Sequence, residues 1–200
     1  MGAAMTQRRS HVSGQNGFTL IETMIAIAIL SFGIVSLVAV FGAAVAVTQN
    51  AEENLIARQK ALQAMESIYT ARNSQQITFS QIANIPSGIF TAGATQLLAA
   101  GPDGLVNTAD DIPYAASAPC PAGPECLVLP GRDGILGTAD DTAMSLTNFT
   151  RQIQIASVLE SDGVTINPNL KQITVTITYY AGGSPVPRTY SVTGLISAFH

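Results

Sequence analysis

The sequence Gly17-Phe18-Thr19-Leu20-Ile21-Glu22 opens the apolar stretch that decides the organisation of this chain of 200 residues. From Phe18 to Ala51 the one charged residue is Glu22, and there is no proline. About 20 apolar residues suffice for an α-helix to cross a bilayer, and this run is longer. Because a carboxylate inside such a helix costs roughly 2.5–3.5 kcal/mol on insertion scales, Glu22 is a candidate functional residue.

The charge balance restricts the classes of partner. Charged residues make up 11% of the chain, and the formal net charge is −4. Residues 1–17 contain Arg8, Arg9 and no acidic residue, so a chain without them has 7 basic and 13 acidic residues. A nucleic-acid-binding face is normally basic. We therefore expect no nucleic-acid partner.

The motif at residues 17–22, followed by a long apolar helix, resembles the prepilin cleavage and methylation motif of type IV pilins and type II secretion pseudopilins. The resemblance implies that a prepilin peptidase cuts after Gly17 and that Phe18 becomes an N-methylated N-terminus. It also implies that Glu22 neutralises the ammonium group of Phe18 in a neighbouring subunit, since a buried charge needs a partner. The alternative for Glu22 is an interfacial carboxylate favoured by the helix dipole. The implied partners are other pilin subunits, the prepilin peptidase and the inner-membrane assembly platform.

The same resemblance assigns residues 1–17 to a leader that is removed. Arg8 and Arg9 precede the apolar run, and basic residues favour the cytoplasmic side of a membrane. We therefore predict a single-pass inner-membrane protein with a cytoplasmic N-terminus and a periplasmic C-terminal domain. After assembly, the location implied by the resemblance is a pilus or the cell surface.

Residues 48–72 turn polar without a helix breaker, which predicts one continuous helix from about Thr19 to Ala71. Its second half is expected to be amphipathic and to pack on a sheet. The predicted apolar stripe consists of residues at spacings close to 3.6: Leu55, Leu62, Met65 and Tyr69.

From residue 149 onward the apolar period changes to two, which is typical of half-buried strands. Three strands of an antiparallel meander are predicted: Phe149–Leu159, Leu170–Tyr180 and Arg188–Ala198. The fold class is therefore α+β, with a long N-terminal helix packed on a C-terminal antiparallel sheet, as in pilins. Residues 73–100 are expected to connect the helix and the sheet.

Residues 101–148 form a region rich in Asp, Gly and Pro with an internal repeat. Gly101–Asp111 matches Gly131–Asp141 at seven of eleven positions. Oxygen ligands in flexible loops suit Ca²⁺, and the copies resemble the Asp-Gly-rich calcium loops of other extracellular repeats. Asp-Gly also forms turns without any metal, so both interpretations stand, and no cofactor is required. In either case we expect a surface-exposed insertion. The candidate calcium ligands are Asp103, Asn107, Asp110, Asp111, Asp133, Asp140 and Asp141.

Cys120 and Cys126 are the two cysteines of the chain, and they lie between the copies of the repeat. In an exported domain such a pair is expected to form a disulfide that closes a short loop. Two reduced thiols or a zinc site are the alternatives. Zinc normally needs about four N or S ligands, and a chain without residues 1–17 adds only His200 to the two thiols.

The sequence favours a structural role over catalysis. There is no phosphate-cradling loop and no glycine-serine-glycine nucleophile motif, so we expect no enzymatic activity. The leading hypothesis is a minor subunit of a type IV pilus, most like the PilV type. Residues 18–85 lack the proline that major pilins often carry in this helix, which favours a minor pilin or a pseudopilin over a major subunit. The alternatives are a type II secretion pseudopilin and a membrane-anchored calcium-binding adhesin.

The predicted segments are a leader (1–17), a transmembrane or filament-core helix (18–47), its amphipathic half (48–72), a connection (73–100), the acidic repeat (101–148) and the sheet (149–200).

Overall fold

The computed structural model describes residues 17–181 and 185–199. The chain divides into two compact units between Val45 and Ala46. One helix, α1 (Leu20–Asn73), contributes to both units. Six strands follow in the second unit.

Helix α1 has defined signals at both ends. The Thr19 side-chain oxygen accepts a hydrogen bond from the Glu22 N–H at 3.3 Å, which caps the first turn. At the other end Gln75 adopts a positive φ of 61°, and the Gln76 N–H bonds back to the Ala71 carbonyl at 2.9 Å. This left-handed exit is a common way to end a helix. The predicted continuous helix is therefore confirmed, with ends shifted by one or two residues.

In the first unit, the described residues from Gly17 to Val45 are all exposed. Among the described residues, α1 is the one helix long and apolar enough to cross a membrane, and none of its most apolar window is buried. A core helix of a soluble protein would bury such a window. The observation agrees with the predicted transmembrane or filament-core segment.

The second unit is built on a four-stranded antiparallel sheet with the order β1-β4-β5-β6. These strands are β1 (Thr95–Gln96), β4 (Phe149–Leu159), β5 (Ile166–Tyr179) and β6 (Arg188–Ser197). The predicted strand at 149–159 is confirmed, and the predicted third strand ends one residue early. The middle strand begins four residues earlier than predicted, because Val158 and Leu159 extend the pairing beyond an irregularity at Ser157.

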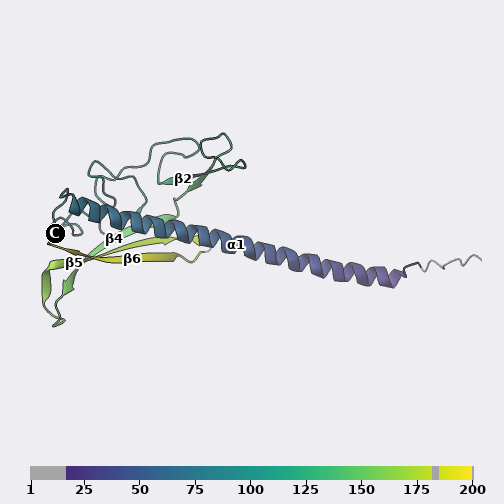
Figure 1. Ribbon diagram of the computed structural model, residues 1–200. Helices are drawn as coiled ribbons and strands as arrows, with labels where there is room; N and C mark the ends of the chain where they lie inside the picture. Colours follow the sequence, from purple (N-terminus) through teal and green to yellow (C-terminus); the bar gives the residue numbers. More distant parts are fainter. Residues whose placement is uncertain (1–16, 182–184, 200) are drawn as a thin grey trace, which may run out of the picture. The chain divides into compact units, whose positions relative to one another are not determined.

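The residues of α1 from 46 to 73 lie along this sheet (Figure 1). Buried residues of the helix join Ile153, Ile173 and Ile177 in one core. The buried face of the helix is rich in alanine, and these small side chains pack in the core of the unit. Its members are Ile56, Ala57, Ala61, Ala64, Met65, Ile68, Ala71 and Arg72.

The predicted apolar stripe of this half was wrong in part. Met65 is buried and Tyr69 is partly buried against the core, but Leu55 and Leu62 are 54% and 43% exposed. Ala57 and Ala61 are in the core instead, and both are fully buried. Spacing and hydropathy favoured the large leucines, whereas the close-packed core takes the small alanine side chains on the neighbouring face of the helix.

The acidic region contains more regular structure than a loop insertion. Strands β2 (Cys126–Leu129) and β3 (Thr142–Ser145) pair antiparallel in a two-stranded sheet. The second copy of the repeat, Gly131–Asp141, connects these two strands and so forms the tip of a hairpin. The expectation of surface exposure is wrong for the first copy, because Leu105 and Asn107 are buried in the core of the unit.

Candidate functional site

The predicted processing motif is open to an enzyme. Phe18 is 80% exposed, and a Cβ built on Gly17 would meet no atom within 4 Å. Neither packing nor a positive φ requires glycine at position 17, so the folded chain does not explain this residue. A bare Cα does allow a protease to approach the backbone, which is the role the motif implies. Residues 1–16, with Arg8 and Arg9, lie outside the described residues.

Glu22 is exposed in the first turn of α1. Its N–H is used in the cap with Thr19, and the helix N-terminus favours a carboxylate in this turn. Both interpretations of Glu22 require a carboxylate near the start of the helix. The pairing with another subunit stays a prediction.

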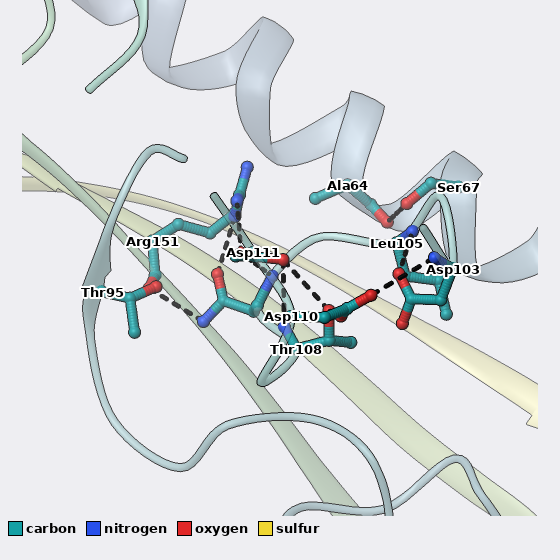
Figure 2. Close-up of polar contacts among 10 residues, drawn as sticks. Ala64, Ser67, Thr95, Asp103, Leu105, Thr108, Asp110, Asp111 and Arg151 are labelled. Atoms are coloured by element: carbon teal, nitrogen blue, oxygen red, sulfur yellow. Dashed lines mark hydrogen bonds and ion pairs between the residues drawn. The ribbon is translucent and has the colours of Figure 1, made fainter. Parts of the chain in front are cut away.

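We call Gly101–Asp111 the first acidic loop and Gly131–Asp141 the second acidic loop. In the first loop, one Asp103 oxygen accepts the Leu105 N–H at 2.8 Å, and Asp110 Oδ2 accepts the Asp103 N–H at 3.3 Å. Thr108 Oγ1 donates to Asp110 Oδ1 at 2.7 Å. The carboxylates thus organise the turn through the loop's own donors (Figure 2).

The second acidic loop repeats these contacts residue by residue. Asp133 accepts the Ile135 N–H at 2.9 Å, Asp140 Oδ2 accepts the Asp133 N–H at 3.3 Å, and Thr138 Oγ1 donates to Asp140 Oδ1 at 2.7 Å. Gly134 has a φ of 70°, matching 69° at the corresponding glycine of the first loop. The repeat in the sequence is therefore a repeat in structure.

A glycine opens each copy because the chain crosses itself there. A Cβ on Gly101 would lie 2.4 Å from the Asp110 carbonyl oxygen, and a Cβ on Gly131 would lie 2.3 Å from the Asp140 carbonyl oxygen. Contacts below 3.0 Å are not tolerated by a real side chain. In both loops, the close approach of the second-last aspartate therefore requires a glycine at the first position.

The first acidic loop is joined to the sheet by Arg151 of β4. Arg151 Nε donates to Asn107 Oδ1 at 2.7 Å, and Asn107 Nδ2 donates to the Arg151 carbonyl at 3.2 Å. The guanidinium also lies 3.9 Å from Asp111 Oδ2. Burial lowers the pKa of Arg151, and Asp111 opposes that shift. Figure 2 shows Arg151 reaching from its strand toward Asp111.

The contacts within the loops shift the pKa values of three of their aspartates. Partial burial raises the pKa of Asp103 above its ordinary value, with Asp110 adding to the rise. The hydroxyl of Thr108 lowers the pKa of Asp110, and the hydroxyl of Thr138 lowers that of Asp140. The second-last aspartate of each loop is therefore held as a charged acceptor.

The fit to a metal ion can be judged from these contacts. Within residues 17–181 and 185–199, no group of three or more His, Cys, Asp or Glu side chains is arranged to hold a metal ion. The aspartate oxygens face N–H and O–H donors of their own loops, as the turn interpretation requires. Calcium binding by the seven candidate ligands stays a prediction.

The predicted disulfide is confirmed. Cys120 and Cys126 are bonded, with their Cα atoms 5.8 Å apart. The bond closes the loop that enters β2. Next to it, Glu125 forms a half-buried ion pair with Lys60 of α1, which ties the base of the hairpin to the helix.

Sequence reasoning did not identify Arg151 as a structural centre. A signal was present, because a period of two places Arg151 on the same face as Phe149 and Ile153, both fully buried. A charged residue at a core position of a strand indicates a buried partner. The identity of that partner, Asn107, could not be read from local sequence.

Comparison with protein families matches residues 12–46 to the model described as "Prokaryotic N-terminal methylation motif". Comparison with curated proteins and with solved structures gave no match. The matched residues contain the exposed Gly17-Phe18 junction and the exposed apolar part of α1. The chain therefore carries the N-terminal signature of type IV pilins and pseudopilins, joined to an α+β domain of pilin-like layout.

Proposed function

We propose that this chain is a structural subunit of a type IV pilus, in a minor rather than a major role, processed by a prepilin peptidase. The observation that carries the proposal is the methylation motif directly before an apolar helix segment with no buried residue. Such a segment needs a bilayer or a bundle of like helices around it. The membrane surrounds this segment before assembly, and a bundle of like helices surrounds it in the filament.

The chain's residues have distinct tasks in this function. Cleavage after Gly17 creates the N-terminal ammonium of Phe18. Glu22 pairs with that ammonium in an adjacent subunit, since a buried charge is tolerable only when it is paired. Residues 18–47 supply cohesion by apolar packing, and the domain from residue 48 onward is presented outside the membrane.

Two features favour the minor role. Residues 18–85 contain no proline, and the acidic hairpin gives the domain a feature beyond the helix and sheet. A type II secretion pseudopilin shares the processing motif and is the alternative within the same superfamily. The observation that separates these two is the machinery with which the processed chain is recovered.

The decisive experiment is intact-mass analysis and N-terminal sequencing of the full chain co-expressed with a prepilin peptidase. We expect an N-methyl-phenylalanine start at Phe18 and the loss of processing in Gly17→Ala. Because a Cβ at position 17 meets no atom within 4 Å, this variant is not expected to disturb folding. A start at Met1 in the presence of active peptidase would contradict the proposal and would favour an unprocessed anchored adhesin.

A further inference from the structure

The two acidic loops have the same internal structure but opposite burial of their apolar pairs. In the first loop Leu105 is 1% exposed and Val106 packs against the core. The corresponding residues of the second loop, Ile135 and Leu136, are 60% and 62% exposed. An identical fold at the tip of a hairpin thus presents two large apolar side chains to the outside.

The first loop shows which kind of surface this apolar pair fits. Leu105 and Asp103 lie beside the Ala64–Ser67 turn of α1 (Figure 2). Gly104 and Val106 line one cavity together with Ala64 and Ser67 of the helix. The Gln76 side chain donates to the Asp103 carbonyl at 2.5 Å and fastens the loop to the chain just after the helix. The first acidic loop therefore lies next to α1, with Leu105 in the core of the unit and Val106 lining a cavity that the helix also lines.

The same helix carries a second face with large apolar side chains that the described residues leave partly exposed. Leu55, Arg58 and Leu62 are exposed, and their spacing places them on one side of α1. In the sequence, Arg58 lies between the two leucines. The second acidic loop carries Arg132 and three aspartates, a net charge of −2, so its charge is opposite to that of Arg58.

We propose that Ile135 and Leu136 of the second acidic loop dock on the Leu55–Leu62 face of α1 in an adjacent copy of this chain. The contact places the second acidic loop next to α1 of a neighbouring copy, as the first loop lies next to α1 of its own chain. It joins two different surfaces of the same molecule, and such a head-to-tail contact propagates into a helical assembly. The inference rests on the proposed function, because it requires neighbouring copies in one assembly.

The test is site-specific photo-cross-linking in the full chain, co-expressed with the peptidase and the pilus assembly machinery. Leu136 is replaced by p-benzoylphenylalanine in one tagged copy, and a second copy carries a different tag. We expect a cross-link between differently tagged chains that maps to the α1 peptide containing Leu55 or Leu62. Leu62→Asp in the second copy should abolish this cross-link.

Val164, which is 82% exposed in the β4–β5 turn, is the matched control position. The same photoreactive residue there should give no cross-link to α1. A start at Phe18 together with cross-links from position 136 elsewhere, within one chain or not at all would overturn the docking and leave the pilin function intact. A chain that is not processed at Phe18 would overturn both.

Discussion

Asn107 holds the first acidic loop to the sheet through both ends of its side-chain amide. It is fully buried, has a φ of 64°, and bonds to the Arg151 guanidinium and to the Arg151 carbonyl. Asparagine tolerates this left-handed backbone better than most residues. Asn107 therefore adopts the left-handed backbone that the loop needs and also supplies a hydrogen-bond acceptor to the buried Arg151 guanidinium.

We expect Asn107→Ala to lower the free energy of unfolding by about 3 kcal/mol, within the range for removing a partner of a buried charge. The loss removes the acceptor of the Arg151 Nε hydrogen bond, and Asp111 lies farther away at 3.9 Å. Asn107→Asp, which keeps the Oδ1 acceptor, is the control and should lose less. Guanidinium chloride unfolding of the processed chain in detergent measures both. A loss below ~1 kcal/mol, the scale of an ordinary hydrogen bond, would contradict this role.

Glu22 is the residue whose task is expected to appear only in the assembly. Glu22→Gln removes the charge while preserving the shape of the side chain. We expect normal cleavage at Gly17 and a reduction of incorporation into sheared filaments of more than about tenfold, because the Phe18 ammonium loses its buried partner. Glu52→Gln, in the polar half of the same helix, is the matched control. Equal incorporation of Glu22→Gln and wild type would favour the interfacial role of Glu22.

At the scale of elements, the second acidic loop is a hairpin tip organised by its own aspartates. The Thr138 hydroxyl lowers the pKa of Asp140 below 3.8 in the folded chain. Because the pKa is lower in the folded chain than in the unfolded chain, the Asp140 carboxylate stabilises the loop at pH values above its pKa in the unfolded chain. This contribution disappears as the pH falls through the pKa of the folded chain.

We therefore expect the contribution of Asp140 to the loop to be lost only as the pH falls through its lowered pKa, and Asp140 to titrate below Asp103, whose pKa is raised by burial. NMR titration of the side-chain carboxyl carbons measures both groups. Thr138→Val should return the pKa of Asp140 toward its ordinary value. If Asp140 titrated above Asp103 in the wild-type chain, the assigned contacts would be wrong.

The calcium prediction belongs to the same loops. Extracellular calcium modules bind with dissociation constants of about 10⁻⁴–10⁻³ M, so millimolar calcium is the appropriate range. If the loops bind calcium, calcium raises the melting temperature of the wild-type chain relative to a chelator, and a double variant, Asp110→Asn with Asp140→Asn, loses most of this rise. Identical melting temperatures with calcium and with chelator would leave turn chemistry as the role of the aspartates.

At the scale of the molecule, the stability of the second unit depends on how tightly the buried face of α1 is packed in the core. Ala61 is fully buried in this core, whereas the adjacent Leu62 is 43% exposed. Ala61→Leu should therefore lower the stability of the unit by about 1–3 kcal/mol through overpacking. Leu62→Ala should change it by less than ~1 kcal/mol, since an exposed side chain forfeits little burial.

Circular dichroism of the processed chain during thermal unfolding in detergent distinguishes these two variants. The two variants also test whether Ala61, and not Leu62 of the predicted apolar stripe, lies in the core. If Leu62→Ala were the more damaging variant, the leucine face of the helix would be the true contact with the sheet.

The local sequence by itself determined the parts of this protein that depend on short-range patterns. The apolar run identified the exposed part of α1, the Gly17-Phe18 motif predicted a processing site, and a period of two located the strands from Phe149 onward. Each of these follows from neighbours a few residues apart, where helix and strand geometry leave few choices. The cysteine pair, six positions apart, belongs to the same class.

Only the tertiary structure decided which of two similar surfaces became the interior. Leu62 and Ala61 are adjacent, and the two acidic loops share most of their sequence, yet one of each pair is buried and the other is not. The choice depends on contacts such as Asn107 with Arg151, which are 44 residues apart. Burial is a property of the assembled core, and local propensity carries no information about which of two equivalent segments will reach it.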